Sequence, residues 1–430
     1  MLAMLLTAQE KLWTLEECMR YAVEHNTKRI KQEAQNEIYK QNKLEAIGGF
    51  LPSINVSSDM SSSYGRVLDK DTYKYVNNTT QYNQYGIYSS VVLFDGFVQL
   101  SKLKVEKFNR LKGLQELQDT KDMLAYETME IFFNVQYYKG TVKLAIHQLQ
   151  QSSDNLNQVI RMADLGMKSV PDVAELRAKE AEDRFLLTKQ KNLYVLEIIK
   201  LKDKMNFPIN DELSTADNDT ILPATGTTDN VMDIYQKFIT NSPKVLASNM
   251  SVESSKATVN IAKGSFYPKL SLYGGLSTYY SRMLNGLNYT PFKEQLRTNE
   301  NYYVGLSLNI PIFNGFSRFA DLKRSKQKLI IAQNEHEEAL RALHTDIEKT
   351  VADVNGLYEE YIQAMKRTES MKIAHQVNQR KFTEGLINAL ELNTSSNRLL
   401  NAQVEELYTN LKYQLKVKLL NYYKGQAIVP

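Results

Sequence analysis

The sequence predicts a mixed α and β fold that is mainly helical and is built twice. One observation is a helical pattern of about 69 residues that nothing breaks except isolated glycines. A second is a set of period-2 segments bounded by Gly and Pro. The third is recurrence. A similar motif occurs at Phe50-Leu51-Pro52 and at Phe266-Tyr267-Pro268. Another occurs at Phe94-Asp95-Gly96-Phe97 and, 219 residues later, at Phe313-Asn314-Gly315-Phe316. We therefore expect two tandem helix–strand–strand–long helix–helix repeats.

The first repeat is expected over residues 9–208. We expect the apolar residues 1–8 to be the remnant of a secretory signal peptide, the alternative being an ordinary frayed chain start. Apolar residues at helical spacing predict one amphipathic helix over 14–47, which ends at the glycines before Pro52. The hairpin expected over 53–94 has the following parts: a strand over 54–64, a polar loop over 66–81 and a strand over 82–94.

The long helix of the first repeat follows at 97–165, a span of about 100 Å. A tight turn at 166–171 and a helix over 172–205 complete the repeat. Pro, Asp, Asn and Gly are concentrated in residues 206–230, and we expect 209–230 to be an equatorial linker between the repeats.

The second repeat, over 231–425, has the same plan and is followed by a tail at 426–430. Its predicted elements are a helix over 231–264, a hairpin over 269–313 with strands at 269–283 and 301–313, a long helix reaching Glu384, and a helix over 391–423. In each repeat the two shorter helices together match the long one in length. We expect them to pack end to end along it.

Composition excludes several classes. The chain has 430 residues, of which 43% are hydrophobic and 24% charged, with one cysteine. It is therefore neither disordered, nor collagenous, nor a disulfide scaffold. The net charge is +4, and Lys and Arg alternate with acids, so no nucleic-acid partner is expected. No apolar run approaches the length of a transmembrane helix, but the strands of a β-barrel give a weaker hydropathy signal, so a membrane role stays open.

The four predicted strands have the length that crosses a bilayer when tilted. Exposed strand edges do not persist in lipid, so several chains must contribute to one sheet. Two chains would give eight strands with a filled interior, and three would give twelve with a lumen. Candidate residues for interfacial aromatic girdles are Tyr64, Tyr82, Tyr88, Tyr273, Tyr279 and Tyr302. The alternative is a soluble β-sandwich cap with surface tyrosines.

The run Arg380-Lys-Phe-Thr-Glu-Gly385-Leu-Ile-Asn-Ala-Leu-Glu391-Leu392 resembles the second helical tip of the TolC family of outer-membrane efflux channels. Arg161-Met-Ala-Asp-Leu-Gly166 with Asp172-Val173 is similar in the first repeat, and the resemblance covers about residues 12–425. It implies a homotrimer in the outer membrane of a Gram-negative bacterium. Twelve strands would form a transmembrane β-barrel in outer-membrane lipid, on a long periplasmic α-helical barrel of coiled-coil character. It also implies a periplasmic adaptor protein and, through it, an inner-membrane pump.

The resemblance also suggests site residues. Glu391 matches a position that lines the periplasmic constriction, and Thr394 stands where the family has a second acid. Asp172 and Glu175 are the weaker constriction candidates of the first repeat. The alternative for the acids is a solvated first helical turn favoured by the helix dipole. Gly166 and Gly385 correspond to tips where the adaptor docks, or they simply end helices.

No pattern predicts an enzyme or a cofactor. The five histidines form no HExxH, and the chain has no P-loop, no GxGxxG after a strand and no cysteine pair. The leading hypothesis is a passive outer-membrane exit duct gated at its helical tips. The alternative is a periplasmic coiled-coil adaptor or tether outside the membrane. Two rods with a membrane-length hairpin each favour the duct, while the cargo stays open.

Overall fold

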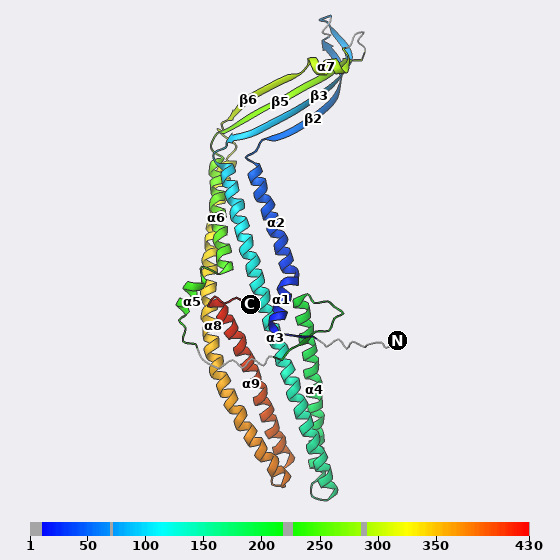
Figure 1. Ribbon diagram of the computed structural model, residues 1–430, viewed down its shortest axis with the longest axis vertical. Coiled ribbons are helices and arrows are strands. Elements are labelled where there is room, and N and C mark those ends of the chain that lie inside the picture. Colours follow the sequence, from blue (N-terminus) through cyan, green and yellow to red (C-terminus); the bar gives the residue numbers. More distant parts are fainter. Residues whose placement is uncertain (1–10, 69–71, 218–226, 285–289, 430) are drawn as a thin grey trace, which may run out of the picture. The chain divides into compact units, whose positions relative to one another are not determined.

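The computed structural model describes residues 11–68, 72–217, 227–284 and 290–429 (Figure 1). The expected signal-peptide remnant at 1–8 lies outside these ranges. The helices are α1 Leu15–His25, α2 Thr27–Gly48, α3 Val98–Asp164, α4 Val170–Met205, α5 Val231–Phe238, α6 Pro243–Gly264, α7 Phe292–Thr298, α8 Ser317–Thr383 and α9 Ala389–Tyr423. The strands are β1 Leu12–Trp13, β2 Ser53–Leu68, β3 Tyr75–Phe94, β4 Ser214–Thr215, β5 Lys269–Met283 and β6 Asn301–Asn309.

The predicted mainly helical class and the doubled order of elements are confirmed. The long helices α3 and α8 have 67 residues each. Both bounds of α3 and the end of α8 lie within one residue of the prediction. None of the helices in the described ranges is long and apolar enough to cross a membrane.

The prediction of one helix over 14–47 is wrong, because Asn26 interrupts it with an extended backbone (ψ 135°). The Asn26 Nδ2 group donates to the carbonyl of Lys204 at 2.8 Å. In return, the Nδ2 group of Asn206 donates to the carbonyl of His25 at 3.1 Å. Asn26, which follows α1, thus satisfies a carbonyl at the end of α4, and Asn206, which follows α4, satisfies one at the end of α1. The local sequence pattern could not predict this break, because the hydrogen-bond partners are about 180 residues apart in the sequence.

The prediction of one helix over 231–264 is also wrong, because α5 and α6 are separate. Pro243 begins α6, and its ring restricts Ser242 to a non-helical backbone. The Ser242 N–H group still donates to the carbonyl of Phe238 at 2.8 Å, which closes the end of α5.

The strands form one antiparallel sheet in the order β2-β3-β5-β6, rather than two isolated hairpins (Figure 1). The central pair β3–β5 joins the hairpins from Thr80 opposite Met283 to Phe94 opposite Leu270. The polar loop expected over 66–81 is mostly strand, because Arg66 pairs with Asn77 and Val67 with Val76. Backbone pairing overrides the polar composition there. The strand expected over 301–313 ends at Asn309.

Packing divides the chain into two compact units that cut across the repeats. The helical unit holds residues up to Gln35, Leu114–Ala247 and the chain from Glu337. The sheet unit holds Asn36–Gly113 and Ser248–His336, including the four-stranded sheet. The repeat bounds 9–208 and 231–425 therefore stay a proposal about sequence duplication, separate from packing.

Three apolar clusters hold the helical unit together. The first surrounds Phe132 and Met205 and includes Cys18, whose side chain is fully buried. Burial raises the pKa of the Cys18 thiol to about 12, so the thiol is unreactive at neutral pH. The second cluster surrounds Ile347, and the third lies beside the turns that follow α3 and α8.

Candidate functional site

The turns α3–α4 and α8–α9 of the helical unit have the same backbone geometry. Gly166 has φ +75° and Gly385, which follows 219 residues later, has φ +78°. In the first turn the N–H groups of Gly166 and Met167 donate to the carbonyls of Ala163 and Met162, at 2.9 and 2.8 Å. The corresponding bonds of the second turn, to Phe382 and Lys381, are 3.1 and 2.8 Å long. Both are Schellman motifs, in which glycine takes the left-handed backbone without strain.

The helices that leave these turns are capped at equivalent positions. The Ser169 side chain accepts a hydrogen bond from the N–H of Asp172 at 3.4 Å, and Asn388 accepts one from the N–H of Glu391 at 2.9 Å. The carboxylate of Asp172 in turn accepts from the Ser169 hydroxyl at 2.7 Å. This bond lowers the pKa of Asp172. Asp172 and Glu391 are thus structural equivalents, each in the first turn of its helix.

The two turns line one shallow depression. Its lining includes Gly166, Gly385, Asp172 and Glu391. The structure therefore brings four of the predicted site residues together. The lining also includes Lys168, so the depression carries two carboxylates and one ammonium group beside the two docking candidates.

Glu175 and Thr394, also equivalent to one another, lie one turn further along their helices. Glu175 accepts a hydrogen bond from the Nδ2 group of Asn393 at 3.3 Å, which links α4 to α9. The Thr394 hydroxyl donates to the Leu390 carbonyl of its own helix at 2.8 Å.

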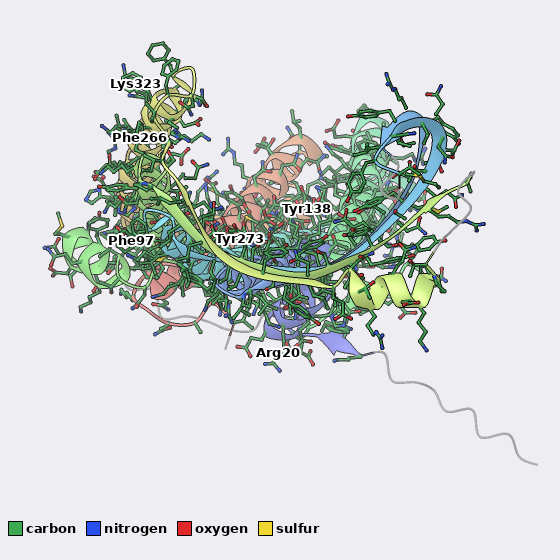
Figure 2. The ribbon with its side chains drawn as sticks, turned by 90° about the horizontal axis from the view of Figure 1, so that it is seen from above. Arg20, Phe97, Tyr138, Phe266, Tyr273 and Lys323 are labelled. Atoms are coloured by element: carbon green, nitrogen blue, oxygen red, sulfur yellow. The ribbon has the colours of Figure 1, made fainter. Side chains whose placement is uncertain are left out.

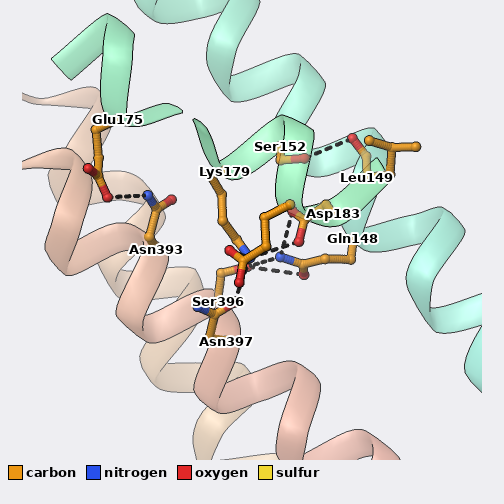
Figure 3. A network of polar contacts seen from close by, with 10 residues as sticks. Gln148, Leu149, Ser152, Glu175, Lys179, Asp183, Asn393, Ser396 and Asn397 are labelled. Atoms are coloured by element: carbon orange, nitrogen blue, oxygen red, sulfur yellow. Dashed lines mark hydrogen bonds and ion pairs between the residues drawn. The ribbon is translucent and has the colours of Figure 1, made fainter. Parts of the chain in front are cut away.

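Sequence reasoning missed a buried polar network next to the turns (Figure 3). Lys179 and Asp183 of α4 are 6% and 1% exposed, and the Lys179 Nζ donates to Asp183 at 2.7 Å. The Lys179 Nζ also donates to Asn397 of α9 at 2.7 Å. A Lys and an Asp four residues apart are usually a solvated pair, so the local pattern gave no signal of burial.

Gln148 extends this network to α3. Its Nε2 donates to Asp183 at 3.3 Å and to the Ser396 hydroxyl at 2.8 Å. An apolar layer of Val159, Leu176, Phe382, Ala389 and Leu392 lies nearby. The helices that carry the two turns are therefore tied to each other by both polar and apolar contacts.

The sheet has one apolar and one polar face, because residues paired across antiparallel strands point to the same side. The more apolar face carries Ile54, Val56, Met60 and Tyr64 on β2; Tyr85, Ile87 and Val91 on β3; Leu270, Leu272, Leu276 and Tyr280 on β5; and Tyr302, Val304, Leu306 and Leu308 on β6. Polar residues on the same face are Ser58, Ser62, Gln81, Asn83, Ser89, Thr278 and Arg282. The polar face carries Asn55, Ser57, Asp59, Ser61 and Ser63 on β2; Tyr82, Gln84, Gly86 and Tyr88 on β3; Tyr273, Gly275, Ser277 and Tyr279 on β5; and Asn301, Tyr303, Gly305 and Ser307 on β6. Val56 on the apolar face is 77% exposed in the single chain.

The structure places the six girdle candidates on both faces. Tyr64 and Tyr302 lie on the apolar face and are 78% and 69% exposed. The four that lie on the polar face are Tyr82, Tyr88, Tyr273 and Tyr279. An irregular polar sequence did not reveal which face each tyrosine takes.

Sequence reasoning also missed exposed aromatic pairs where strands lead into long helices. Phe94 and Phe97 pack edge to face at 5.5 Å between ring centroids, and Phe313 and Phe316 do so at the same distance. Phe97 and Phe316 are 64% and 72% exposed. Their recurrence in the sequence was the available signal.

In the described ranges, no three His, Cys, Asp or Glu side chains gather closely enough to hold a metal ion. Solved outer-membrane proteins share this fold of a four-stranded antiparallel sheet and paired long helices. The solved outer membrane protein VceC of Vibrio cholerae has this fold, with a TM-score of 0.81, 13% identity and coverage of 96% of each chain. The outer membrane channel CmeC of Campylobacter jejuni matches with a TM-score of 0.81, 12% identity and coverage of 96% of this chain and 87% of its own.

The outer membrane channel MtrE of Neisseria gonorrhoeae, solved in its open state, matches with a TM-score of 0.77 at 17% identity, over 95% of this chain and 88% of its own. Residues 234–424 match the model of the family described as outer membrane efflux protein. No curated protein matches the chain. The family match and the shared fold relate the chain to outer-membrane efflux proteins. Members of the family that residues 234–424 match are transport ducts of the outer membrane and are not enzymes.

Proposed function

We propose that three copies of this chain form a passive exit duct across the outer membrane. The two-faced sheet carries this proposal. Within the described sheet, β2 and β6 each pair with one neighbour. An open edge costs several kcal/mol per unpaired backbone group in lipid, so β2 of one copy pairs with β6 of the next until the sheet closes.

The chemistry of the two sheet faces supports a barrel of twelve strands from three chains over one of eight strands from two chains. An eight-stranded barrel has an interior just wide enough for side chains to fill it. The polar face, with its serines, asparagines and glutamine, suits a water-filled interior instead. Leu270 to Tyr280 on the apolar face spans about 34 Å of strand, or about 26 Å of height at the usual tilt, which matches the apolar band of such barrels.

Exposed aromatic residues on and beside the apolar face are candidates for contacts with the lipid boundary. Tyr64 and Tyr302 lie on this face, and the exposed Phe97 and Phe316 lie at the strand-to-helix junctions. Aromatic rings favour the boundary between lipid tails and head groups. We propose interfacial positions for Tyr64, Phe97 and Phe316. Tyr302 lies opposite Leu276, inside the apolar band, and would face the lipid tails.

The two helical turns are the proposed periplasmic gate. Three copies of Glu391 around an axis repel one another and favour cations, and Asp172 adds acids from the equivalent position. Gly166 and Gly385 leave room for a periplasmic adaptor to approach the backbone, since a Cβ built at either glycine meets no atom within 4 Å. The adaptor would connect the duct to an inner-membrane pump that supplies the cargo, either small molecules or polypeptides.

The alternative, a coiled-coil adaptor or tether outside the membrane, leaves the apolar face without a cover. Val56, Val304 and Leu306 are 77%, 78% and 64% exposed. A soluble protein rarely keeps so large an apolar patch in water.

Neighbouring residues on opposite faces test the proposal. Val56→Arg puts a charge on the apolar face, at a cost of up to about 2–4 kcal/mol in lipid. Asn55→Arg puts the same charge on the polar face, where water solvates it. We expect Val56→Arg to abolish recovery of assembled protein from outer-membrane fractions, and Asn55→Arg to retain it. Equal recovery of the two variants would contradict a lipid-facing apolar side.

A further inference from the structure

Five tyrosines on the polar face lie in register along the sheet. They are Tyr82 and Tyr88 on β3, Tyr273 and Tyr279 on β5, and Tyr303 on β6. Tyr88 lies opposite Gly275, which lies opposite Tyr303, while Tyr273 lies opposite Gly305. Further along, Tyr279 is paired with Gln84, two residues from Tyr82. We call these five residues the tyrosine ladder.

Glycines beside the ladder allow its rings to lie across the backbone. A Cβ at Gly305 would lie 2.7 Å from the Tyr273 hydroxyl oxygen, and a Cβ at Gly86 would lie 2.3 Å from that of Tyr88. Each of these rings occupies the space that a side chain would otherwise fill. The rings thus lie next to glycines, as in sheets where aromatic residues shield glycines.

The rings follow one another closely. Tyr82 and Tyr279 stack with centroids 5.4 Å apart and planes 27° apart. Tyr273 and Tyr303 have centroids 6.1 Å apart. Tyr82, Tyr273 and Tyr303 are 36%, 40% and 37% exposed. From Tyr273 to Ser281, the residue opposite Tyr82, the ladder covers about 27 Å of strand.

The ladder lies on the concave side of the sheet. Phe292 of α7 packs edge to face against Tyr85 and Tyr280, which both belong to the apolar face. Seen from above, the sheet is curved, with α7 against its convex side and Tyr273 labelled on the other (Figure 2). The polar face, opposite α7, is therefore the concave one.

The surroundings of the ladder are nearly neutral. Between Tyr82 and Ser90, and between Tyr273 and Ser281, the polar face carries only Ser, Gln, Gly and Tyr. Asp59 on β2, opposite Gln84, is the charged group beside this stretch. Flat rings with hydroxyl groups bind by stacking and by single hydrogen bonds, which suits uncharged solutes with a planar ring.

We propose that the tyrosine ladder is a stacking track that binds uncharged solutes with planar aromatic rings as they pass through the duct. The inference rests on the proposed function, since the concave face must line the lumen. Several weak, closely spaced sites let a solute enter and leave, whereas one tight site would block the duct.

Current noise in planar bilayers tests the track. The probe is p-nitrophenyl β-glucoside, and methyl β-glucoside, which has the same sugar but no aromatic ring, is its control. For the unaltered protein we expect excess current noise with p-nitrophenyl β-glucoside and none with methyl β-glucoside. The solute concentration that halves the current, the half-blocking concentration, measures the affinity. The double variant Tyr273→Leu, Tyr303→Leu should raise the half-blocking concentration about fivefold or more, since each stacked pair contributes about 0.5–1.5 kcal/mol. The matching Phe variant keeps the rings and should change this concentration less than about twofold.

Each outcome decides a separate point. Equal noise with both glucosides, or an unchanged half-blocking concentration in the Leu variant, overturns the track. If the double Leu variant does not conduct, the single variant Tyr82→Leu replaces it, and we again expect a higher half-blocking concentration than in the unaltered protein. Conductance steps without excess noise contradict the track and leave the duct standing. No conductance from the unaltered protein contradicts the duct, and the track with it.

Discussion

The Lys179 Nζ donates a 2.7 Å hydrogen bond to Asp183 in a place where both side chains are almost fully buried. Asn397 and Ser396 of α9, Gln148 of α3 and the exposed Glu182 of α4, which accepts from Lys179 at 3.2 Å, surround this pair. The helices behind the two turns therefore meet at an ion pair. Burying an ion pair contributes little on balance, but removing one member leaves an uncompensated charge.

Lys179→Met should destabilise the protein by about 3–5 kcal/mol, because the Asp183 carboxylate stays buried without its cation. Thermal unfolding followed by circular dichroism in detergent measures this. The double variant Lys179→Met, Asp183→Asn removes both charges and should recover most of the loss. Lys40→Met, which breaks the exposed pair with Glu37 (3.1 Å), should cost less than about 1 kcal/mol. Equal melting temperatures for Lys179→Met and Lys40→Met would contradict the buried pair.

Acidification should weaken the helical unit through His375. Its side chain is buried and bonded to the Ser395 hydroxyl at 3.2 Å, and burial, with a smaller contribution from His147, lowers the pKa of His375. Because the pKa of His375 is lowered in the folded state, the neutral side chain makes its full contribution to stability above the ordinary histidine pKa of about 6.5. This contribution is lost as the pH falls through the folded-state pKa.

The prediction is checked by melting temperatures between pH 7.5 and 5. The decrease on acidification should be smaller in His375→Gln than in the unaltered protein. The control is His344→Gln at a histidine whose side chain is 38% exposed, and it should keep the full decrease. An identical decrease in all three proteins would show that His375 does not titrate with unfolding.

Gly385→Leu should impair efflux while leaving assembly intact. The backbone there has φ +78°, so a side chain costs about 1–2 kcal/mol of strain but meets open space. Gly425→Leu is the matched control, since Gly425 also has a positive φ (+97°) and open space around it. Growth of a pump-dependent strain in the presence of a toxic substrate measures efflux. Normal efflux with Gly385→Leu would refute docking at this turn.

Glu391→Ala should raise the conductance of the closed state, because in the proposed trimer it removes a ring of three carboxylates from the gate. Glu384→Ala is the control, since Glu384 directly follows α8 and does not line the depression that Glu391 lines. Single-channel recording gives both values. If the two variants conduct like the unaltered protein, Glu391 does not line the gate.

Sequence patterns predicted the elements that local interactions decide. The long helices, the strand Lys269–Met283 and both glycine turns follow from periodicity and from glycine's left-handed backbone. Elements decided by distant partners were missed. The break at Asn26 depends on Lys204, the strand at Arg66 depends on Asn77, and the burial of Lys179 depends on Asn397.

The candidate site follows the same division. Asp172 and Glu391 could be placed in equivalent first turns, because the duplication fixes their spacing from the glycines. The faces of the tyrosines could not be placed, because Ser, Asn and Tyr occur on both sides of β3 and the register with β5 decides which side is polar.

The native mass of the protein extracted from membranes tests the central claim most directly. Light scattering in detergent, with the detergent contribution subtracted, gives the number of chains in a particle. The account predicts three chains and a requirement for detergent, because twelve strands close the sheet around a lumen. A particle of one or two chains that stays in solution without detergent would contradict the duct.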